Sequence, residues 1–103
     1  MQMHPKALTI LRELSKGFDG CKISYRYANE LHKFRIEWGP TYWLYVDDHY
    51  VETQTEEELL ERLTHWQIVD ALRNSPRSRW LLLGDRGVID VDDGFGAEYR
   101  TRY

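Results

Sequence analysis

Three adjacent residues, Asp47, Asp48 and His49, carry side chains that bind metal ions or exchange protons in many proteins. Neighbouring residues of a strand point to opposite faces, so Asp47 and Asp48 converge on one ion only if a turn rotates them. The pattern therefore favours a solvated strand end. We expect no metal ion and no catalytic residue here.

Other patterns that resemble catalytic or cofactor motifs fail on spacing. The run from Asp90 to Gly94 resembles a calcium loop, but glycine stands at the fifth position, where the EF-hand needs an oxygen ligand. The glycines at 84 and 87 lack the lysine and the spacing of a phosphate loop. No Ser or Cys stands in a nucleophile-elbow frame. We therefore expect a protein that is not an enzyme and has no cofactor.

An acidic run without any Lys or Arg is the first candidate binding site, and it consists of Asp47, Asp48, Glu52, Glu56, Glu57 and Glu58. Such a run could mimic nucleic acid and compete for a basic groove on a partner, since complementary charge raises the association rate. The alternative is a solvated helix start. The first hypothesis is a small protein that docks on a larger protein or ribonucleoprotein complex, such as a phage or mobile-element inhibitor of a host defence complex.

The second candidate site is one face of a predicted sheet. If Ile23, Tyr25, Phe34 and Ile36 face the helices, the opposite face carries Lys22, Arg26, Lys33 and Arg35, together with either Trp43 and Tyr45 or Tyr42 and Leu44. Cations beside rings suit stacking on single-stranded nucleic acid or cation–π contacts with a protein. The alternatives are pairing with Glu37 or coverage by the segment after Trp80. A nucleic-acid-binding module is thus the alternative function.

A third group, Arg73, Arg77 and Arg79, could contact phosphate. Cations are also favoured at the end of a helix, where they complement its dipole, and this explains Arg73 without any ligand.

The elements that position these residues follow from hydrophobic periodicity. It predicts one α+β domain over residues 1–103, a three-stranded antiparallel meander flanked by two helices (α-β-β-β-α) with one or two short C-terminal strands. Thr55 and Glu58 form a capping-box pattern before the second helix. The predicted helices are 5–16 and 56–73, and the predicted strands are 22–27, 33–38, 42–46, 80–83 and 88–91. Residues 28–32 are predicted as a loop, 49–54 as a strand continuation or a loop, and 92–103 as a flexible or partner-ordered tail.

Composition narrows the class of protein. The net charge is −3, but residues 1–45 are mildly basic and the remainder is acidic, which does not favour a generic nucleic-acid binder. The single Cys21 excludes an intramolecular disulfide and a cysteine-based zinc site. No apolar run has the length of a signal peptide or a membrane span, so we expect a cytoplasmic protein with no membrane contact. Fourteen aromatic residues make a homodimer plausible.

The order helix, three strands, helix across residues 5–73 resembles the double-stranded-RNA-binding domain. That family binds phosphate with lysines at the start of its last helix, where this chain has Thr55, Glu56, Glu57 and Glu58. The resemblance therefore implies a fold and argues against that RNA-binding mode. The compact, acidic character is also similar to that of many phage or mobile-element proteins that inhibit a host complex.

Overall fold

A five-stranded sheet with four helices forms the described part of the chain. The computed structural model describes residues 4–85 and 87–90, so the predicted tail at 92–103 and most of the calcium-like run lie outside the described residues. The elements are α1 (Pro5–Gly17), β1 (Lys22–Ala28), β2 (Leu31–Glu37), β3 (Thr41–Asp47), α2 (Asp48–Thr53), α3 (Glu56–His65), α4 (Ile68–Arg73), β4 (Arg79–Gly84) and β5 (Gly87–Asp90). The predicted α+β class, with its meander and short C-terminal strands, is confirmed.

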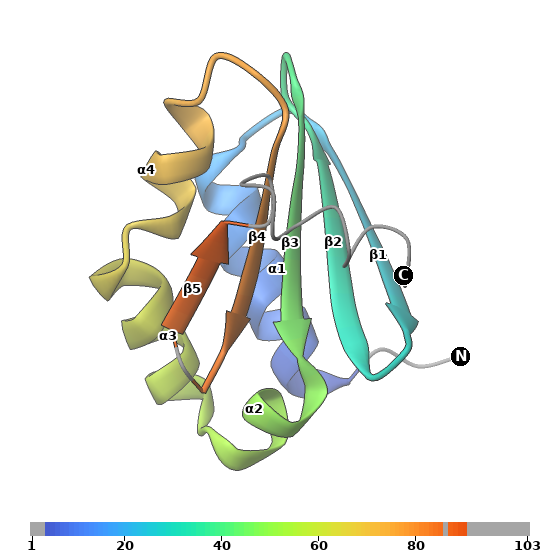
Figure 1. Cartoon of the computed structure of the whole chain (residues 1–103), viewed down its shortest axis with the longest axis vertical. Helices are drawn as coiled ribbons and strands as arrows, with labels where there is room; N and C mark the ends of the chain where they lie inside the picture. Colours follow the sequence, from blue (N-terminus) through green and yellow to red (C-terminus); the bar gives the residue numbers. More distant parts are fainter. Residues whose placement is uncertain (1–3, 86, 91–103) are drawn as a thin grey trace.

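The sheet has the strand order β1-β2-β3-β4-β5 (Figure 1). Strands β1, β2 and β3 form the predicted antiparallel meander. Strand β4 pairs with β3 in parallel, and β5 pairs with β4 in antiparallel orientation. Strands β3 and β4 are parallel because α2, α3 and α4 stand between them in the sequence. This long connection returns the chain to the end of the sheet at which β3 begins.

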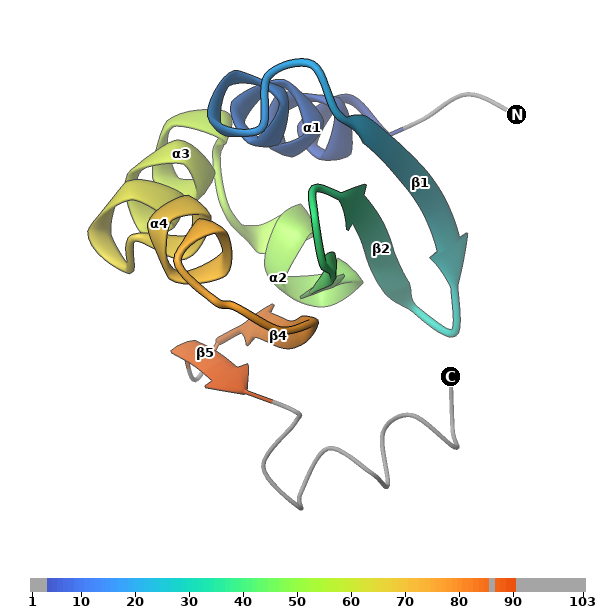
Figure 2. The same ribbon diagram turned by 90° about the horizontal axis from the view of Figure 1, so that it is seen from above.

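All four helices lie on one side of the curved sheet (Figure 2). The buried face of the sheet includes Phe34, Leu44 and Leu81, which lie in register across β2, β3 and β4 and are at most 2% exposed. Ala7, Ile10 and Leu14 of α1 bury the opposing helix face. Tyr42, Leu44 and Val46 thus belong to the core. Of the two arrangements that the sequence left open for β3, this is the one with Trp43 and Tyr45 on the opposite face.

The connection between β1 and β2 is shorter than expected. The sequence predicts a loop at 28–32, but Ala28 and Leu31 pair in the sheet and only Asn29 and Glu30 remain as a turn. Both turn residues have positive φ, 54° and 62°. This turn follows the twist of the two strands and keeps them paired to their ends, so His32 is a strand residue with its side chain in the interior.

Residues 48–53 form helix α2, so the prediction of a strand continuation or loop is wrong. Asp47 is the last residue of β3 and also caps this helix, since its Oδ2 accepts a hydrogen bond of 3.2 Å from the backbone N–H of Tyr50. Aspartate is a favoured N-cap because its oxygen pairs with a donor that the first turn leaves free. The cap turns the chain and buries Tyr50 and Val51.

The predicted helix at 56–73 is two helices, α3 and α4. Its start is as expected, because the Thr55–Glu58 capping box is present. Gln67 breaks it with a left-handed backbone at φ 49° and ψ 44°. On one straight helix Leu63 and Ile68 would point about 140° apart, yet both side chains are buried. The break at Gln67 lets both enter the core, which hydrophobic periodicity does not anticipate.

Candidate functional site

Two rows of cross-strand neighbours lie on the face of the sheet that points away from the helices, here called the outer face. Ser24, Arg35, Trp43 and Trp80 form the first row, and Arg26, Lys33, Tyr45 and Leu82 form the second. Because residues opposite each other in neighbouring strands point to the same face, the structure selects Trp43 and Tyr45, rather than Tyr42 and Leu44, as the companions of the cations.

The outer face is hollowed into a shallow depression of about 250 Å³. Its lining is Ser24, Tyr25, Arg26, Lys33, Arg35, Trp43 and Tyr45. Five of the six residues predicted from the sequence for this site are therefore brought together. The sixth, Lys22, is exposed at the start of β1 opposite Glu37 and does not line the depression. The volume lies below that of a typical drug-sized pocket and suits one small group of a larger ligand.

Lys33 and Tyr45 lie at the buried part of the outer face. Lys33 is 7% exposed and Tyr45 is 8% exposed, and the Lys33 ammonium lies 5.1 Å from the centre of the Tyr45 ring. Burial, together with the nearby charge of Arg26, lowers the pKa of Lys33.

Arg26 and Arg35 are the accessible cations of this site. Arg26 is exposed and lies opposite Lys33. The side chain of Arg35 is 55% exposed and pairs with Glu37 at 3.4 Å. Pairing with Glu37 was one of the alternatives, but a long ion pair between exposed side chains contributes little free energy. Arg35 therefore remains available to a ligand that offers a stronger anion.

Three aromatic rings lie beside these cations on β3 and β4. The Trp43 and Trp80 ring centres are 5.4 Å apart, and the Tyr45 ring meets Trp80 edge to face at 4.9 Å. Sequence analysis did not assign Trp80 to the site, because the parallel pairing of β3 with β4 is a long-range contact. After Trp80, residues 81–84 and 87–90 extend the sheet as β4 and β5 (Figure 1). The rest of the segment that was expected to cover the outer face, residues 91–103, lies outside the described residues.

Half of the acidic run makes contacts inside the protein. Asp47 caps α2. Asp48 accepts a 2.7 Å hydrogen bond from His32, and Glu58 accepts one from the Thr55 N–H at 2.9 Å. That capping contact lowers the pKa of Glu58. Glu52, Glu56 and Glu57 are exposed. The run is thus divided between helix caps, a buried network and three solvated acids.

The network around His32 was missed by the sequence analysis. His32 is 2% exposed, and its Nδ1 lies 2.7 Å from the Tyr25 hydroxyl while its Nε2 lies 2.7 Å from Asp48 Oδ1. The ring of Tyr27 is 4.9 Å away. Desolvation raises the pKa of Tyr25. These contacts join β1, β2 and α2, which gives this histidine a structural role.

No cluster of metal ligands exists within residues 4–85 and 87–90. Asp47 accepts the capping hydrogen bond of α2 and Asp48 is hydrogen-bonded to His32, while His49 is exposed. In the same part of the chain, no helix is long and apolar enough to cross a membrane.

The arginine group is also largely explained by internal contacts. Arg73 lies 5.3 Å from the centre of the Trp38 ring. Arg79 donates hydrogen bonds of 3.1 Å to the Ala71 carbonyl and to Ser75 Oγ. Arg77 is exposed. The three guanidinium groups do not form one phosphate site.

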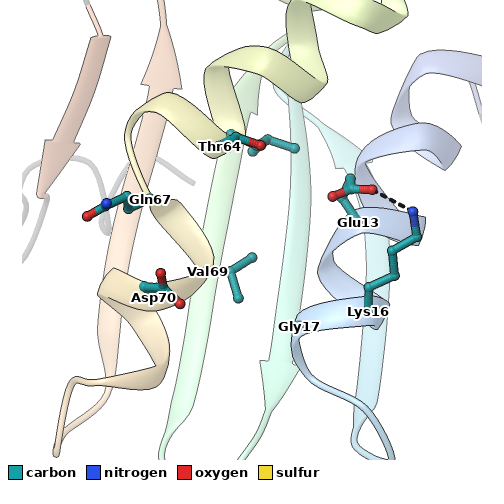
Figure 3. Close-up of a pocket in the computed structure, with 8 residues that line it drawn as sticks. Glu13, Lys16, Gly17, Thr64, Gln67, Val69 and Asp70 are labelled. Carbon is teal, nitrogen blue, oxygen red and sulfur yellow. Dashed lines mark hydrogen bonds and ion pairs between the residues drawn. The ribbon is translucent and has the colours of Figure 1, made fainter.

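A second depression, of about 400 Å³, lies between α1, α3 and α4 (Figure 3). Its polar groups include Glu13 and Lys16, which pair with each other at 2.8 Å, and Asp70 on the facing helix. Glu13 and Lys16 compensate one another, and Asp70 leaves these three residues with one net negative charge, which does not attract an anion. This groove therefore offers less to a ligand than the outer face does.

Comparisons with known proteins leave the site to be interpreted from its own geometry. No family model, no curated protein and no solved structure matches this chain.

Proposed function

We propose that this protein binds single-stranded nucleic acid on the outer face of its sheet and carries out no chemistry on it. The observation that supports the proposal is the convergence of Arg26, Lys33 and Arg35 with Trp43 in one depression. Single-strand-binding proteins combine cations that hold phosphates with rings on which bases stack. The net charge of −3 does not oppose this, because the depression is lined by Arg26, Lys33 and Arg35 and by no acidic residue among the described ones.

The acidic run provides weaker support for the hypothesis of docking on a partner protein. Asp47, Asp48 and Glu58 are held by internal hydrogen bonds, and acids at the start of α3 stabilise the helix. Inhibition of a host complex stays a prediction, as do the homodimer and the cytoplasmic location. Only Tyr27 and Trp38 are exposed large hydrophobic residues in the described ranges, which reduces the need for a dimer to cover rings.

The test is fluorescence anisotropy of the whole protein with a labelled thymidine 12-mer at several salt concentrations. We expect a Kd on the order of 10⁻⁵ M at physiological salt. Two phosphate contacts, from the exposed Arg26 and Arg35, predict a slope of log K against log salt of about −1.4. The double variant Arg26→Glu with Arg35→Glu should abolish binding without unfolding the protein, because both side chains are exposed.

The matched control is Arg12→Glu with Lys16→Glu on α1, which changes the net charge equally on the other side of the molecule. Both residues are exposed, and this variant should weaken binding only slightly. Equal loss in both double variants would mean that net charge, and not the outer face, controls binding. A polyglutamate peptide that binds while the oligonucleotide does not would replace nucleic acid with an acidic protein segment as the ligand.

A further inference from the structure

Strand β1 is an open edge of the sheet. It stands first in the strand order, so within residues 4–85 and 87–90 it has a neighbouring strand, β2, on one side only (Figure 1). The strand is seven residues long, and all seven pair in register with β2. In an antiparallel pair only alternate residues exchange hydrogen bonds with the partner, so the backbone groups of the other set point outward from the edge. Such a row of backbone groups is a template for another strand.

The side chains that β1 places on the buried face of the sheet are incompletely covered. They are Ile23, Tyr25 and Tyr27, and Tyr27 is 45% exposed. Ile23 and Tyr25 are half-buried, whereas the three residues opposite this row on β2 are at most 2% exposed. A strand added beside β1 would place its own side chains next to this row, and apolar side chains there would complete its cover.

On the outer face the same edge is cationic. Lys22 and Arg26 are both exposed on β1. The only acid that β1 and β2 place on this face is Glu37, and it pairs with Arg35 at 3.4 Å. Like charges in neighbouring positions destabilise strand pairing, and cations on an edge strand therefore oppose pairing of two identical copies. An added strand with acids on this side would instead be attracted.

From the open edge, the uncovered row and the edge cations, we infer that β1 binds an extended acidic peptide by strand addition. The peptide alternates apolar residues, which cover the row of Tyr27, with Asp or Glu, which face Lys22 and Arg26. Backbone hydrogen bonds provide affinity in this mode of recognition, and alternate side chains provide specificity. The inference goes beyond the proposed function, because it depends on the backbone edge of β1 and not on the depression.

The first experiment adds the capped heptapeptide Val-Glu-Val-Glu-Val-Glu-Val, whose alternation is the same in either chain direction, to the whole protein. Amide hydrogen exchange measured by NMR locates it. We expect one alternate set of amides in residues 22–28 to gain protection, namely the set that does not pair with β2. Protection gained only outside β1 would overturn the inference.

Two N-methylated versions of the peptide are the matched controls. The amides that face β1 belong to alternate residues, so methylation of all Glu amides or of all Val amides blocks the pairing in one peptide and spares it in the other. We expect one version to bind as the parent does and the other to lose binding. Equal binding of the two versions would contradict strand addition.

A charge swap tests the acidic positions. Lys22→Glu with Arg26→Glu should keep the fold, since both side chains are exposed, and should weaken binding of the Glu peptide by about 2- to 30-fold. The corresponding Val-Lys peptide should bind this variant more tightly than it binds the wild type. Arg12→Glu with Lys16→Glu on α1 changes the net charge equally and should leave both affinities nearly unchanged; equal effects of the two double variants would overturn the role of Lys22 and Arg26.

Two further outcomes would contradict the inference. A dimer of the free protein that the peptide does not dissociate, detected by sedimentation, would make a second copy the occupant of the edge. Absence of peptide binding at about 1 mM would mean that the edge of β1 accepts no such strand. Neither result changes the oligonucleotide titration, which tests the proposed function separately.

Discussion

The ammonium of Lys33 lies over the ring of Tyr45, 5.1 Å from its centre, on a sheet face that has none of the four helices on it. This pair joins the cationic β2 to the aromatic β3. It also explains why a lysine that is 7% exposed is tolerated: the ring face partly replaces the water that the ammonium has lost.

Lys33→Met is expected to keep the fold, because methionine preserves the apolar stem of a side chain that is 7% exposed. The pKa of Lys33 is lowered in the folded protein, so the unfolded chain binds the extra proton between the lowered pKa and the ordinary value near 10.5. Stability of the wild type relative to Lys33→Met should therefore rise with pH in that interval. Urea titrations of both proteins from pH 7 to 10.5 measure this difference, and a falling difference would contradict the burial of the ammonium.

His32→Ala should destabilise the protein by about 2 to 4 kcal/mol, because it leaves a cavity and removes the partner of both Tyr25 and Asp48. Tyr25→Phe removes one hydrogen bond and should cost about 1 kcal/mol. Denaturant unfolding of the two variants tests this order. Equal small losses would show that the network does not hold β1, β2 and α2 together.

Gly17→Ala should destabilise the protein by about 1 to 3 kcal/mol. Alanine normally stabilises a helix relative to glycine, but a Cβ at Gly17 would overlap Cγ1 of Val69 on α4. The double variant with Val69→Ala should recover part of the loss that the added methyl causes. Thermal unfolding of the two variants and of Val69→Ala alone provides the comparison, and a more stable Gly17→Ala would show that α1 and α4 are free to move apart.

The Thr55–Glu58 capping box should make helix α3 sensitive to acid. The pKa of Glu58 is lowered by its hydrogen bonds to Thr55, so this contribution to stability is complete above the ordinary glutamate value near 4.5 and is lost as the pH falls through the lowered pKa. Glu58→Gln should remove this pH dependence, so the difference in stability between wild type and variant should shrink as the pH falls. Thr55→Ala should cost about 1 kcal/mol at neutral pH, and circular dichroism from pH 7 to 3 follows both.

The parts of the fold that depend on local patterns were predictable. Alternation in β1, β2 and β3 and the capping box at Thr55 identify their elements correctly, because each depends on residues close in the sequence. The break at Gln67 could not be predicted, since it depends on the need to bury both Leu63 and Ile68. Helix α2 has a local signal in the N-cap Asp47, but Asp47 is also the last residue of β3, and the sequence pattern indicates only that end of the strand.

The candidate site was likewise predictable where it depends on local pattern and not where it depends on long-range pairing. Alternation along the strands identified Arg26, Lys33 and Arg35 together with Trp43 and Tyr45 as one of two arrangements. The choice between them, and the addition of Trp80, required the register of β3 with both of its neighbours. The sequence could not show that Asp48 is hydrogen-bonded to His32, because those two residues belong to different elements.

The parallel pairing of β3 with β4 has a consequence for the order of folding. The cations of the outer face belong to a hairpin closed by Asn29 and Glu30, and short loops close quickly. Trp43 meets Trp80 only after α2, α3 and α4 have been traversed, a closure of high contact order that is slow. The arginines of β1 and β2 should therefore be in place early in refolding, and the two tryptophans should come together among the last contacts that form.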